Sequence, residues 1–227
     1  QLAALAAQKS GAGYVKIFAP SGFPAPHSSI VVETVADVDE LKQKLADDRI
    51  SALVVGPGLG RDDHANALLD AALTTEAPLL IDADALMIAG SRFCELVAGR
   101  MAETVVTPHA GEFARLTSDS LADKIDDSRK LAAQSGCHIL LKGSDSVIAS
   151  PDGAASISAL SCPWLSTAGT GDILAGIIAS RLASGASGYR AACEGQWLHS
   201  RAAHLAGPAF TPEMLIDQLP ATLQECL

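Results

Sequence analysis

Two hydrophobic periods alternate along the first part of the chain. Short apolar runs bounded by glycine or proline are typical of buried strands, and stripes of apolar residues spaced three or four apart are typical of helices. The predicted strands cover residues 14–19, 51–55, 78–82 and 103–107. The predicted helices cover an opening segment marked by Leu2, Leu5 and Ala6, a segment marked by Val38, Leu41 and Leu45, residues 62–73 with Asp62 as N-cap, residues 86–98 with a break, and residues 111–116 and 121–135.

The pattern changes after residue 136. Three short strands are predicted at residues 137–142, 146–150 and 154–159, and the turn sequence Pro151-Asp152-Gly153 joins the last two into a hairpin. Long helical stripes follow over residues 173–182 and 191–205. Alternating strands and helices followed by a hairpin predict an α/β fold with a mostly parallel central sheet flanked by helices and an antiparallel hairpin near one end.

Composition favours one domain over several. The chain has 227 residues and no proline- or serine-rich break, so a single domain is expected over residues 1–227. Apolar residues make up 48% of the chain and aromatic residues only 4%, so the core is expected to consist of Ala, Val, Leu and Ile. The chain starts at Gln1 inside a helical pattern, which we interpret as an amino-terminally truncated domain and not as a signal peptide.

Charge and cysteine content exclude several classes of partner. A formal net charge of −10 disfavours nucleic acid, because the phosphate backbone would be repelled. Five scattered cysteines without a CxxC pair predict neither a disulfide framework nor a zinc site, and they fit a reducing cytoplasm. Apolar runs such as residues 50–55 are too short to cross a bilayer, so no membrane association is expected.

The segment from Thr167 to Asp172 carries the clearest candidate chemistry. Gly169, Thr170 and Gly171 allow a tight backbone path just before a helix, whose free N–H groups and partial positive charge stabilise an anion. We predict that they form a phosphate cradle and that Asp172 takes a proton from an attacking hydroxyl. The alternative is a plain helix start with Asp172 as N-cap, which the two glycines make less attractive.

Two further loops follow predicted strands, where ligands bind in open α/β sheets. The loop Gly56-Pro57-Gly58-Leu59-Gly60 matches neither the GxGxxG nor the GK[ST] pattern, so it is equally a ligand-facing loop or a strained turn. Asp82 and Asp84 could together hold a magnesium ion. We slightly favour the structural alternative, in which Asp84 caps the next helix and Asp82 is buried with backbone partners.

Three other polar residues lie at predicted strand ends. His109 is a candidate for ligand contact, and Glu112 for a helix capping box. Lys142 is placed to neutralise a nucleotide phosphate, with Gly143 letting the chain bend over it. The alternative for Lys142 is a solvated side chain on an exposed hairpin turn. The other histidines have no metal-binding spacing and receive no role.

Six segments in fixed order make the chain resemble the ribokinase-like superfamily, and within it the ADP- or ATP-dependent NAD(P)H-hydrate dehydratases of the YjeF carboxyl-terminal domain family. They are Ser10-Gly11-Ala12-Gly13, Val55-Gly56-Pro57-Gly58-Leu59-Gly60, Ile81-Asp82-Ala83-Asp84-Ala85-Leu86, Thr107-Pro108-His109-Ala110-Gly111-Glu112, Leu141-Lys142-Gly143 and Ala168-Gly169-Thr170-Gly171-Asp172-Ile173-Leu174-Ala175-Gly176. The resemblance implies a three-layer ribokinase-like fold. It also implies a lyase that phosphorylates the ring hydroxyl of (6S)-NAD(P)H hydrate and eliminates phosphate, which restores NAD(P)H.

The resemblance also implies roles for individual residues. Asp172 would activate the hydroxyl and contact the substrate, together with Gly60 and His109. The transferred phosphoryl group would lie in the cradle. ADP or ATP, accompanied by Mg²⁺, would contact Lys142, Gly143, Ser144, Asp145, Ser146 and Gly171. No metal ligand is assigned.

Partners follow from the same resemblance. Members assemble as homo-oligomers of four or more subunits, and some are fused to an NAD(P)H-hydrate epimerase domain or work beside a separate one. The chain departs from the family pattern in lacking its first strand and in having Ser161-Cys162-Pro163 where Gly-Asn-Pro is common. The alternative functions are a ribokinase-like kinase of a small alcohol, such as a hydroxymethylpyrimidine or a sugar, and a regulatory protein that binds nucleotide without chemistry.

Overall fold

The computed structural model describes residues 1–20, 22–117 and 121–226. The strands are β1 (Lys16–Ala19), β2 (Val31–Thr34), β3 (Leu53–Val55), β4 (Leu79–Ile81), β5 (Thr104–Val106), β6 (His138–Leu141), β7 (Val147–Ala149) and β8 (Ala155–Ile157). The helices are α1 (Leu2–Lys9), α2 (Val38–Leu45), α3 (Asp63–Leu73), α4 (Asp84–Ala89), α5 (Phe93–Val97), α6 (Ala110–Thr117), α7 (Lys124–Ser135), α8 (Thr170–Ala183), α9 (Gly188–Ala206), α10 (Pro212–Asp217) and α11 (Leu219–Gln224), with short 3-10 turns at Gly90–Arg92 and Pro163–Ser166.

The main sheet has the order β3-β4-β5-β6-β7-β8. Strands β3 to β6 are parallel, whereas β7 runs antiparallel to both β6 and β8. The predicted fold class is therefore confirmed, including the hairpin at one end. The parallel order also places the loops after β3, β4, β5 and β6 along one edge of the sheet.

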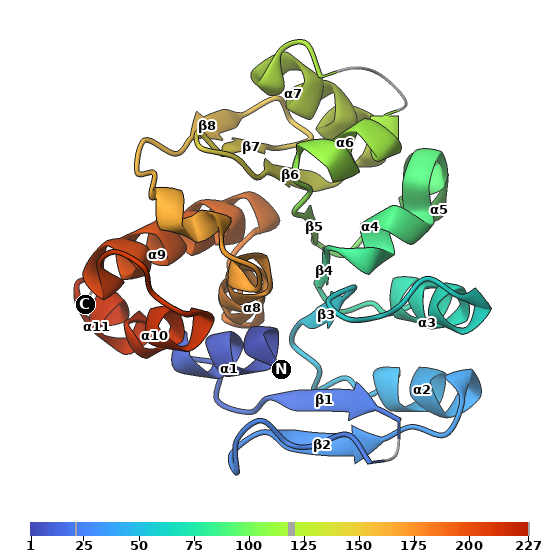
Figure 1. Cartoon of the computed structure of the whole chain (residues 1–227). Coiled ribbons are helices and arrows are strands. Elements are labelled where there is room, and N and C mark those ends of the chain that lie inside the picture. Colours follow the sequence, from blue (N-terminus) through green and yellow to red (C-terminus); the bar gives the residue numbers. More distant parts are fainter. Residues whose placement is uncertain (21, 118–120, 227) are drawn as a thin grey trace.

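Helices cover both faces of this sheet, which gives three layers (Figure 1). Alternate strand residues pack into separate cores: Ile81, Val106 and Leu141 face α3 to α7, whereas Leu80 and Leu140 face α8 and α9. Side chains of successive strand residues point to opposite faces, so both sets must be apolar. This explains why the strands have no hydrophobic–polar alternation in the sequence.

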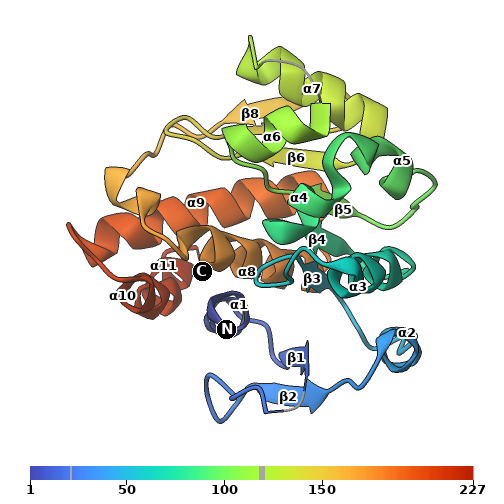
Figure 2. The same cartoon turned by 45° about the vertical axis from the view of Figure 1, so that its right-hand side comes forward.

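Strands β1 and β2 form a separate parallel pair beside α2 (Figures 1 and 2). The sequence predicts the first of these strands but not the second. In β2, Val31 and Thr34 are exposed, and the four-residue run is too short to show a period. Residues 31–34 form a strand because they pair with β1 across a loop. Their local sequence pattern does not specify a strand.

Two local signals, the N-cap of α3 and the break after α4, are as predicted. The Asp62 side chain accepts a hydrogen bond of 2.8 Å from the Ala65 amide, which confirms the predicted N-cap. The break predicted in residues 86–98 is also confirmed, because Gly90 has a φ of 50° between α4 and α5. Helices α10 and α11 are not predicted, since each is only six residues long.

Helix α8 is buried between α1 and α9, as Figure 2 shows. Gly176 and Gly195 allow the close approach. A Cβ at Gly176 would lie 2.1 Å from the Ala3 carbonyl oxygen, and one at Gly195 would lie 2.4 Å from Ile178 Cγ1. The backbone contact at Ala3 has no flexible atom that could move aside. The amino-terminal end of α8 is therefore held by packing along its length.

We predict that Gly176→Ala lowers the free energy of unfolding by about 1–3 kcal/mol, the usual cost of overpacking a core. An exposed helical glycine replaced by alanine would instead gain about 1 kcal/mol, so the sign of the change is informative. Thermal or urea unfolding measures it. Gly13→Ala is the control, because nothing lies within 4 Å of its added Cβ. Equal stability of the two variants would contradict the packing argument.

Candidate functional site

Four loops and one helix end meet at the carboxyl edge of the parallel strands. The loop after β6 joins the loop after β5 through a hydrogen bond of 2.8 Å from the Lys142 amide to the Pro108 carbonyl. The loop after β3 joins the start of α4 through the Gly60 amide, 3.1 Å from Asp84 Oδ2. The start of α8 closes the group, because a Cβ on Gly171 would lie 3.6 Å from Lys142 Nζ. The loops that the sequence places at one edge of the sheet are therefore in contact, and their common function stays a prediction.

The predicted cradle has the backbone of an anion site. Gly169 precedes α8 with a φ of 91°, a left-handed conformation that favours glycine. The Thr170 hydroxyl fixes the turn by donating to the Leu165 and Thr167 carbonyls at 2.6 and 2.8 Å. Within the described ranges, the Gly171 and Asp172 amides have no acceptor. Free amides at a helix start can bind a phosphate oxygen.

Asp172 is half-buried in the first turn of α8. Its carboxylate makes neither a hydrogen bond nor an ion pair with any residue that the structure describes, so it does not act as the N-cap. Burial raises its pKa above the ordinary aspartate value, and the nearby negative charge of Asp82 raises it further. An unpaired carboxylate with a raised pKa is suited to accept a proton.

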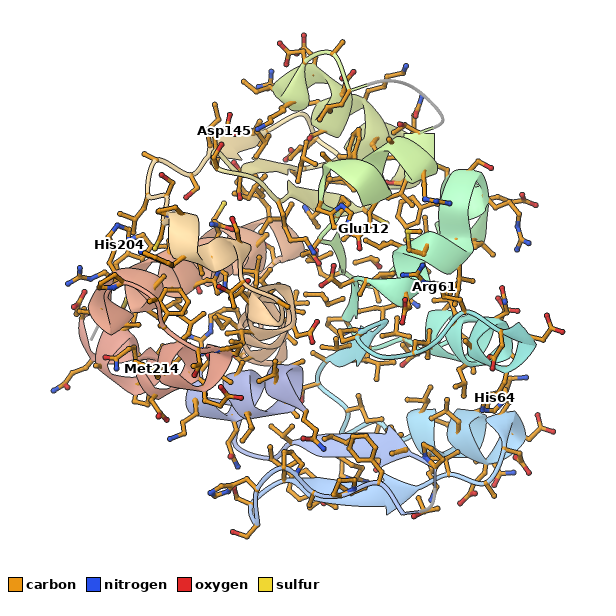
Figure 3. The ribbon with its side chains drawn as sticks, in the orientation of Figure 1. Arg61, His64, Glu112, Asp145, His204 and Met214 are labelled. Carbon is orange, nitrogen blue, oxygen red and sulfur yellow. The ribbon has the colours of Figure 1, made fainter. Side chains whose placement is uncertain are left out.

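Lys142 points into the site. Its Nζ lies 2.8 Å from Asp82 Oδ1 and 3.8 Å from Glu112 Oε2, and its side chain is 20% exposed. Since the same ammonium group faces Gly171, it lies between two carboxylates and the cradle. The alternative of a solvated lysine on an exposed turn is wrong. Figure 3 labels Glu112, which comes from the start of α6.

The two aspartates after β4 take different partners. Asp82 is 1% exposed and pairs with Lys142, so the prediction of burial is correct but the partner is a side chain. Asp84 is the first residue of α4, whose N-cap is Ala83, so the predicted capping role is wrong. Its carboxylate instead accepts from the Gly60 amide and from Arg61 Nε at 2.6 Å. In the described residues, no three His, Cys, Asp or Glu side chains are placed to bind a metal ion.

The glycine loop after β3 is shaped by contact with the β4 end. A Cβ on Gly56 would lie 1.7 Å from the Asp82 carbonyl oxygen, so only glycine fits there. Gly58 and Gly60 have φ values of 68° and 83°, which side chains rarely adopt. The strained-turn interpretation is therefore correct for Gly56, while Gly58 faces open space.

His109 and Glu112 form a reciprocal cap at the start of α6. The Glu112 side chain accepts from the His109 amide at 2.8 Å, and His109 Nδ1 accepts from the Glu112 amide at 3.1 Å. The predicted capping box is confirmed, with histidine at the N-cap position. The His109 side chain remains 59% exposed, so it is accessible to a ligand at the site edge.

The other predicted nucleotide contacts form the turn between β6 and β7. The Ser146 hydroxyl closes this turn by accepting from the Gly143 amide at 3.2 Å and donating to the Gly143 carbonyl at 3.1 Å. Ser144 and Asp145 are exposed. Lys124, from the start of α7, pairs with Asp145 and lies over Gly143.

Sequence reasoning missed three residues at this edge: Arg61, Lys124 and His199. The cation directly after the glycine loop was a signal for Arg61, but no local pattern marked Lys124. His199 is buried in α9, and desolvation lowers its pKa to about 4, so the ring is neutral at pH 7. It lies against the Thr170 backbone at the start of α8.

The layered sheet and the cradle beside a carboxylate define a ribokinase-like protein. A ribokinase-like superfamily protein from Enterococcus faecalis has 25% sequence identity and a TM-score of 0.84, over 99% of this chain and 81% of that one. The model of the Carb_kinase family, described as NAD(P)H-hydrate dehydratase, matches residues 1–225. The chain belongs to the NAD(P)H-hydrate dehydratase family.

Two named relatives are similar over much of the chain. The bifunctional NAD(P)H-hydrate repair enzyme of Mycobacterium leprae is 43% identical over 169 residues, which are 72% of this chain and 36% of that protein. The chain spans less than half the length of each curated relative it matches here. The ADP/ATP-dependent NAD(P)H-hydrate dehydratase of Bacillus subtilis, co-crystallised with ATP and Mg²⁺, has 27% identity and a TM-score of 0.84, over 99% of this chain and 83% of that one.

We predict that Asp82→Asn lowers the pKa of Asp172. The substitution removes a negative charge that disfavours ionisation of the Asp172 carboxyl, while the positive charge of Lys142 remains. A ¹³C NMR titration of labelled aspartate carboxyl groups measures the change. Asp70→Asn, on the exposed side of α3, is the control and should leave the Asp172 titration unchanged. An unchanged or higher pKa in the Asp82 variant would show that the two carboxyl groups are not coupled.

Proposed function

We propose that the chain catalyses the ADP- or ATP-dependent dehydration of (6S)-NAD(P)H hydrate to NAD(P)H. The observation that carries this proposal is the unpaired Asp172 carboxylate beside the free amides of Gly171 and Asp172, opposite the Lys142 ammonium group. Such an arrangement suits phosphoryl transfer to a hydroxyl group. Family membership supports the nicotinamide substrate, and the Bacillus subtilis relative supports the nucleotide.

In the proposed reaction, Asp172 accepts the proton of the ring hydroxyl as its oxygen attacks the terminal phosphorus of the nucleotide. The new O–P bond forms while the bond from phosphorus to the nucleotide oxygen breaks. The Gly171 and Asp172 amides, with Gly169 and Thr170 shaping the cradle, stabilise the charge on the transferred group, and Lys142 balances it from the opposite side. The ring nitrogen then expels the phosphate, and the departing phosphate accepts the proton of the neighbouring ring carbon as the double bond of the dihydropyridine is restored.

Apart from Asp172, the carboxylates of the site are not free to hold a metal ion by themselves. Asp82, Asp84 and Glu112 are each engaged by a cation or an amide. We therefore propose that the nucleotide phosphates and water hold most of the Mg²⁺ coordination, as is usual for this ion. When bound, Mg²⁺ neutralises phosphate charge. Gly143, Ser144, Asp145 and Ser146 of the β6–β7 turn are the proposed remaining nucleotide contacts.

The substrate is proposed to lie at the β3–β5 end of the same edge. The Gly60 loop and His109 border that end. Because the Gly60 amide already donates to Asp84, its contact with a ligand would be one of close approach and not of hydrogen bonding. His109 offers an exposed imidazole next to the buried Glu112.

Further proposals concern the protein as a whole. We propose that residues 1–227 act as one catalytic domain, that it assembles into a homo-oligomer, and that an NAD(P)H-hydrate epimerase is fused to it or works beside it. The bifunctional relatives, which are more than twice as long, support the last point. In the described residues, no helix has the length and apolar character needed to cross a membrane. Cytoplasmic location is a proposal supported by the cysteines, which are all unpaired thiols.

The decisive experiment supplies hydrated NADH or hydrated NADPH with ADP or ATP and Mg²⁺, and follows the absorbance of the restored dihydropyridine. We expect recovery with at least one nucleotide, together with release of inorganic phosphate. A small-molecule kinase of the same fold would instead leave a stable phosphate ester. No recovery with any combination of the two substrates and two nucleotides would overturn the proposed function.

We predict that Asp172→Asn reduces kcat by at least about a hundredfold, the usual contribution of a positioned general base, with little change in nucleotide affinity. The raised pKa of Asp172 also predicts the direction in which the activity of the wild type changes with pH. The group is active when ionised, so kcat/KM should fall as the pH drops through a value above the ordinary aspartate range. Initial rates across pH measure both effects. Full activity of the asparagine variant would remove Asp172 from its role.

Lys142→Gln is expected to raise the KM for the nucleotide and to lower kcat, because the phosphate loses a charged partner that is largely shielded from solvent. The variant also leaves Asp82 buried without its cation, so its stability should fall as well. Comparing unfolding curves and kinetics separates the two effects. Unchanged nucleotide KM in a folded variant would place Lys142 in a purely structural role.

A further inference from the structure

Arg61 is an exposed arginine with a fixed orientation at the edge of the site. Its Nε donates to Asp84 Oδ1 at 2.6 Å, and its side chain is 60% exposed. Asp84 is itself held by the Gly60 amide through its other oxygen. The guanidinium group is therefore tied to the first turn of α4 and to the glycine loop, and does not move freely in solvent. Neither sequence motifs nor the proposed reaction gives it a task.

The two terminal nitrogens of Arg61 have no hydrogen-bond partner anywhere in the described ranges. A guanidinium group held by one nitrogen keeps donors that match the spacing of phosphate oxygens. Since Asp84 already fixes the side chain, less conformational entropy is lost when an anion binds. The arrangement is thus suited to a phosphate group.

The negative charges at this end of the site favour such a cation. The negative charge of Asp84, the partner of Arg61, is among the charges that raise the Asp172 pKa. A dinucleotide substrate carries at least two negative charges, and the protein has a net charge of −10. Lys142 is occupied by Asp82 and faces the cradle. Arg61 is exposed and can balance a substrate phosphate.

The exposed cations of the edge lie at its two ends. Figure 3 shows Arg61 beside the start of α4 and Asp145, the partner of Lys124, at the far end near β7, with Glu112 between them. A site that transfers a phosphoryl group between two phosphorylated molecules needs positive charge on both sides of the transfer point. Lys124 lies with the nucleotide turn, which leaves Arg61 for the other molecule.

We propose that Arg61 binds a phosphate of the dinucleotide substrate, either in its diphosphate bridge or, in the NADP form, on the 2′ position. This inference rests on the proposed function for the identity of the substrate. Asp84 is then a positioning residue, because it holds the guanidinium group in place. The side chain contributes to binding and not to the chemical step.

Steady-state kinetics of Arg61→Gln and Arg61→Lys with hydrated NADH and hydrated NADPH, at saturating nucleotide, test the proposal. The glutamine variant should raise the substrate KM about tenfold or more, the loss expected for a charge-assisted hydrogen bond to phosphate. Lysine should restore part of the affinity, since it keeps the charge but loses the planar donors. The kcat and the nucleotide KM should stay close to wild type.

Arg190→Gln is the matched control. Arg190 is also exposed and held through Nε by a carboxylate, that of Glu194 at 2.5 Å, but it lies on α9, the helix on the other face of the sheet. Its substrate KM should be that of wild type. A KM increase for both substrates assigns Arg61 to the diphosphate, and an increase for hydrated NADPH alone assigns it to the 2′-phosphate. Unchanged KM for both, with or without a lower melting temperature, would overturn the proposal.

Calorimetric titration of hydrated NADPH separates this inference from the proposed function. If wild type turns over the substrate and Arg61→Gln has a normal KM, only the Arg61 assignment fails. If wild type shows no turnover, the proposed reaction fails, and the Kd values of wild type and Arg61→Gln still decide the assignment. A protein that neither converts nor binds the dinucleotide would overturn both.

Discussion

The buried ion pair between Lys142 and Asp82 is the interaction on which the rest of the site depends. The two residues follow β6 and β4, so their contact spans β5, and the Lys142 amide is bonded to the loop after β5 as well. One ammonium group serves Asp82 and Glu112 and faces Gly171. Removing one partner of such a pair typically costs about 3–5 kcal/mol, because the other charge stays buried. Lys142 therefore stabilises the arrangement of β4, β5, β6 and the start of α8. The ammonium group that does this is the one proposed to contact a phosphate.

This pairing sorts the carboxylates of the site into two groups. Asp82, Asp84 and Glu112 each have a cation or an amide as partner. Asp172 has neither, and burial raises its pKa. Four acidic side chains in one region are thus not equivalent, because three of them have partners that hold the structure and Asp172 has none among the described residues. The difference arises from hydrogen bonding and not from position along the sheet.

Sequence alone predicts the elements of this site better than its contacts. The cradle glycines, the capping box at Glu112 and the strand ends follow from local patterns that act within a few residues. The inward direction of Lys142 does not, because its partner Asp82 lies 60 residues away in sequence. Asp84 was expected to cap its own helix, but the glycine loop 24 residues earlier supplies its amide donor. Strand β2 was not predicted because it also depends on a non-local contact. Its pairing with β1, and not its composition, makes it a strand. What the sequence cannot provide is the choice among partners that only the fold brings together.

The proposed dehydration needs no base of the protein besides Asp172, because the departing phosphate can accept the second proton. In hydrated nicotinamide, the carbon that carries the hydroxyl group is bonded to the ring nitrogen. Once that oxygen is phosphorylated, the nitrogen electron pair can expel phosphate, and loss of a proton from the neighbouring carbon completes the double bond. The protein must then supply what a ribokinase-like kinase supplies: a base, an anion cradle and a cation opposite it, here Asp172, the start of α8 and Lys142. Under this proposal, the substrate and not an additional catalytic group decides whether the phosphate ester persists. The features that distinguish a dehydratase from a kinase of the same fold should therefore lie among the residues that select the substrate, at the β3–β5 end of the site.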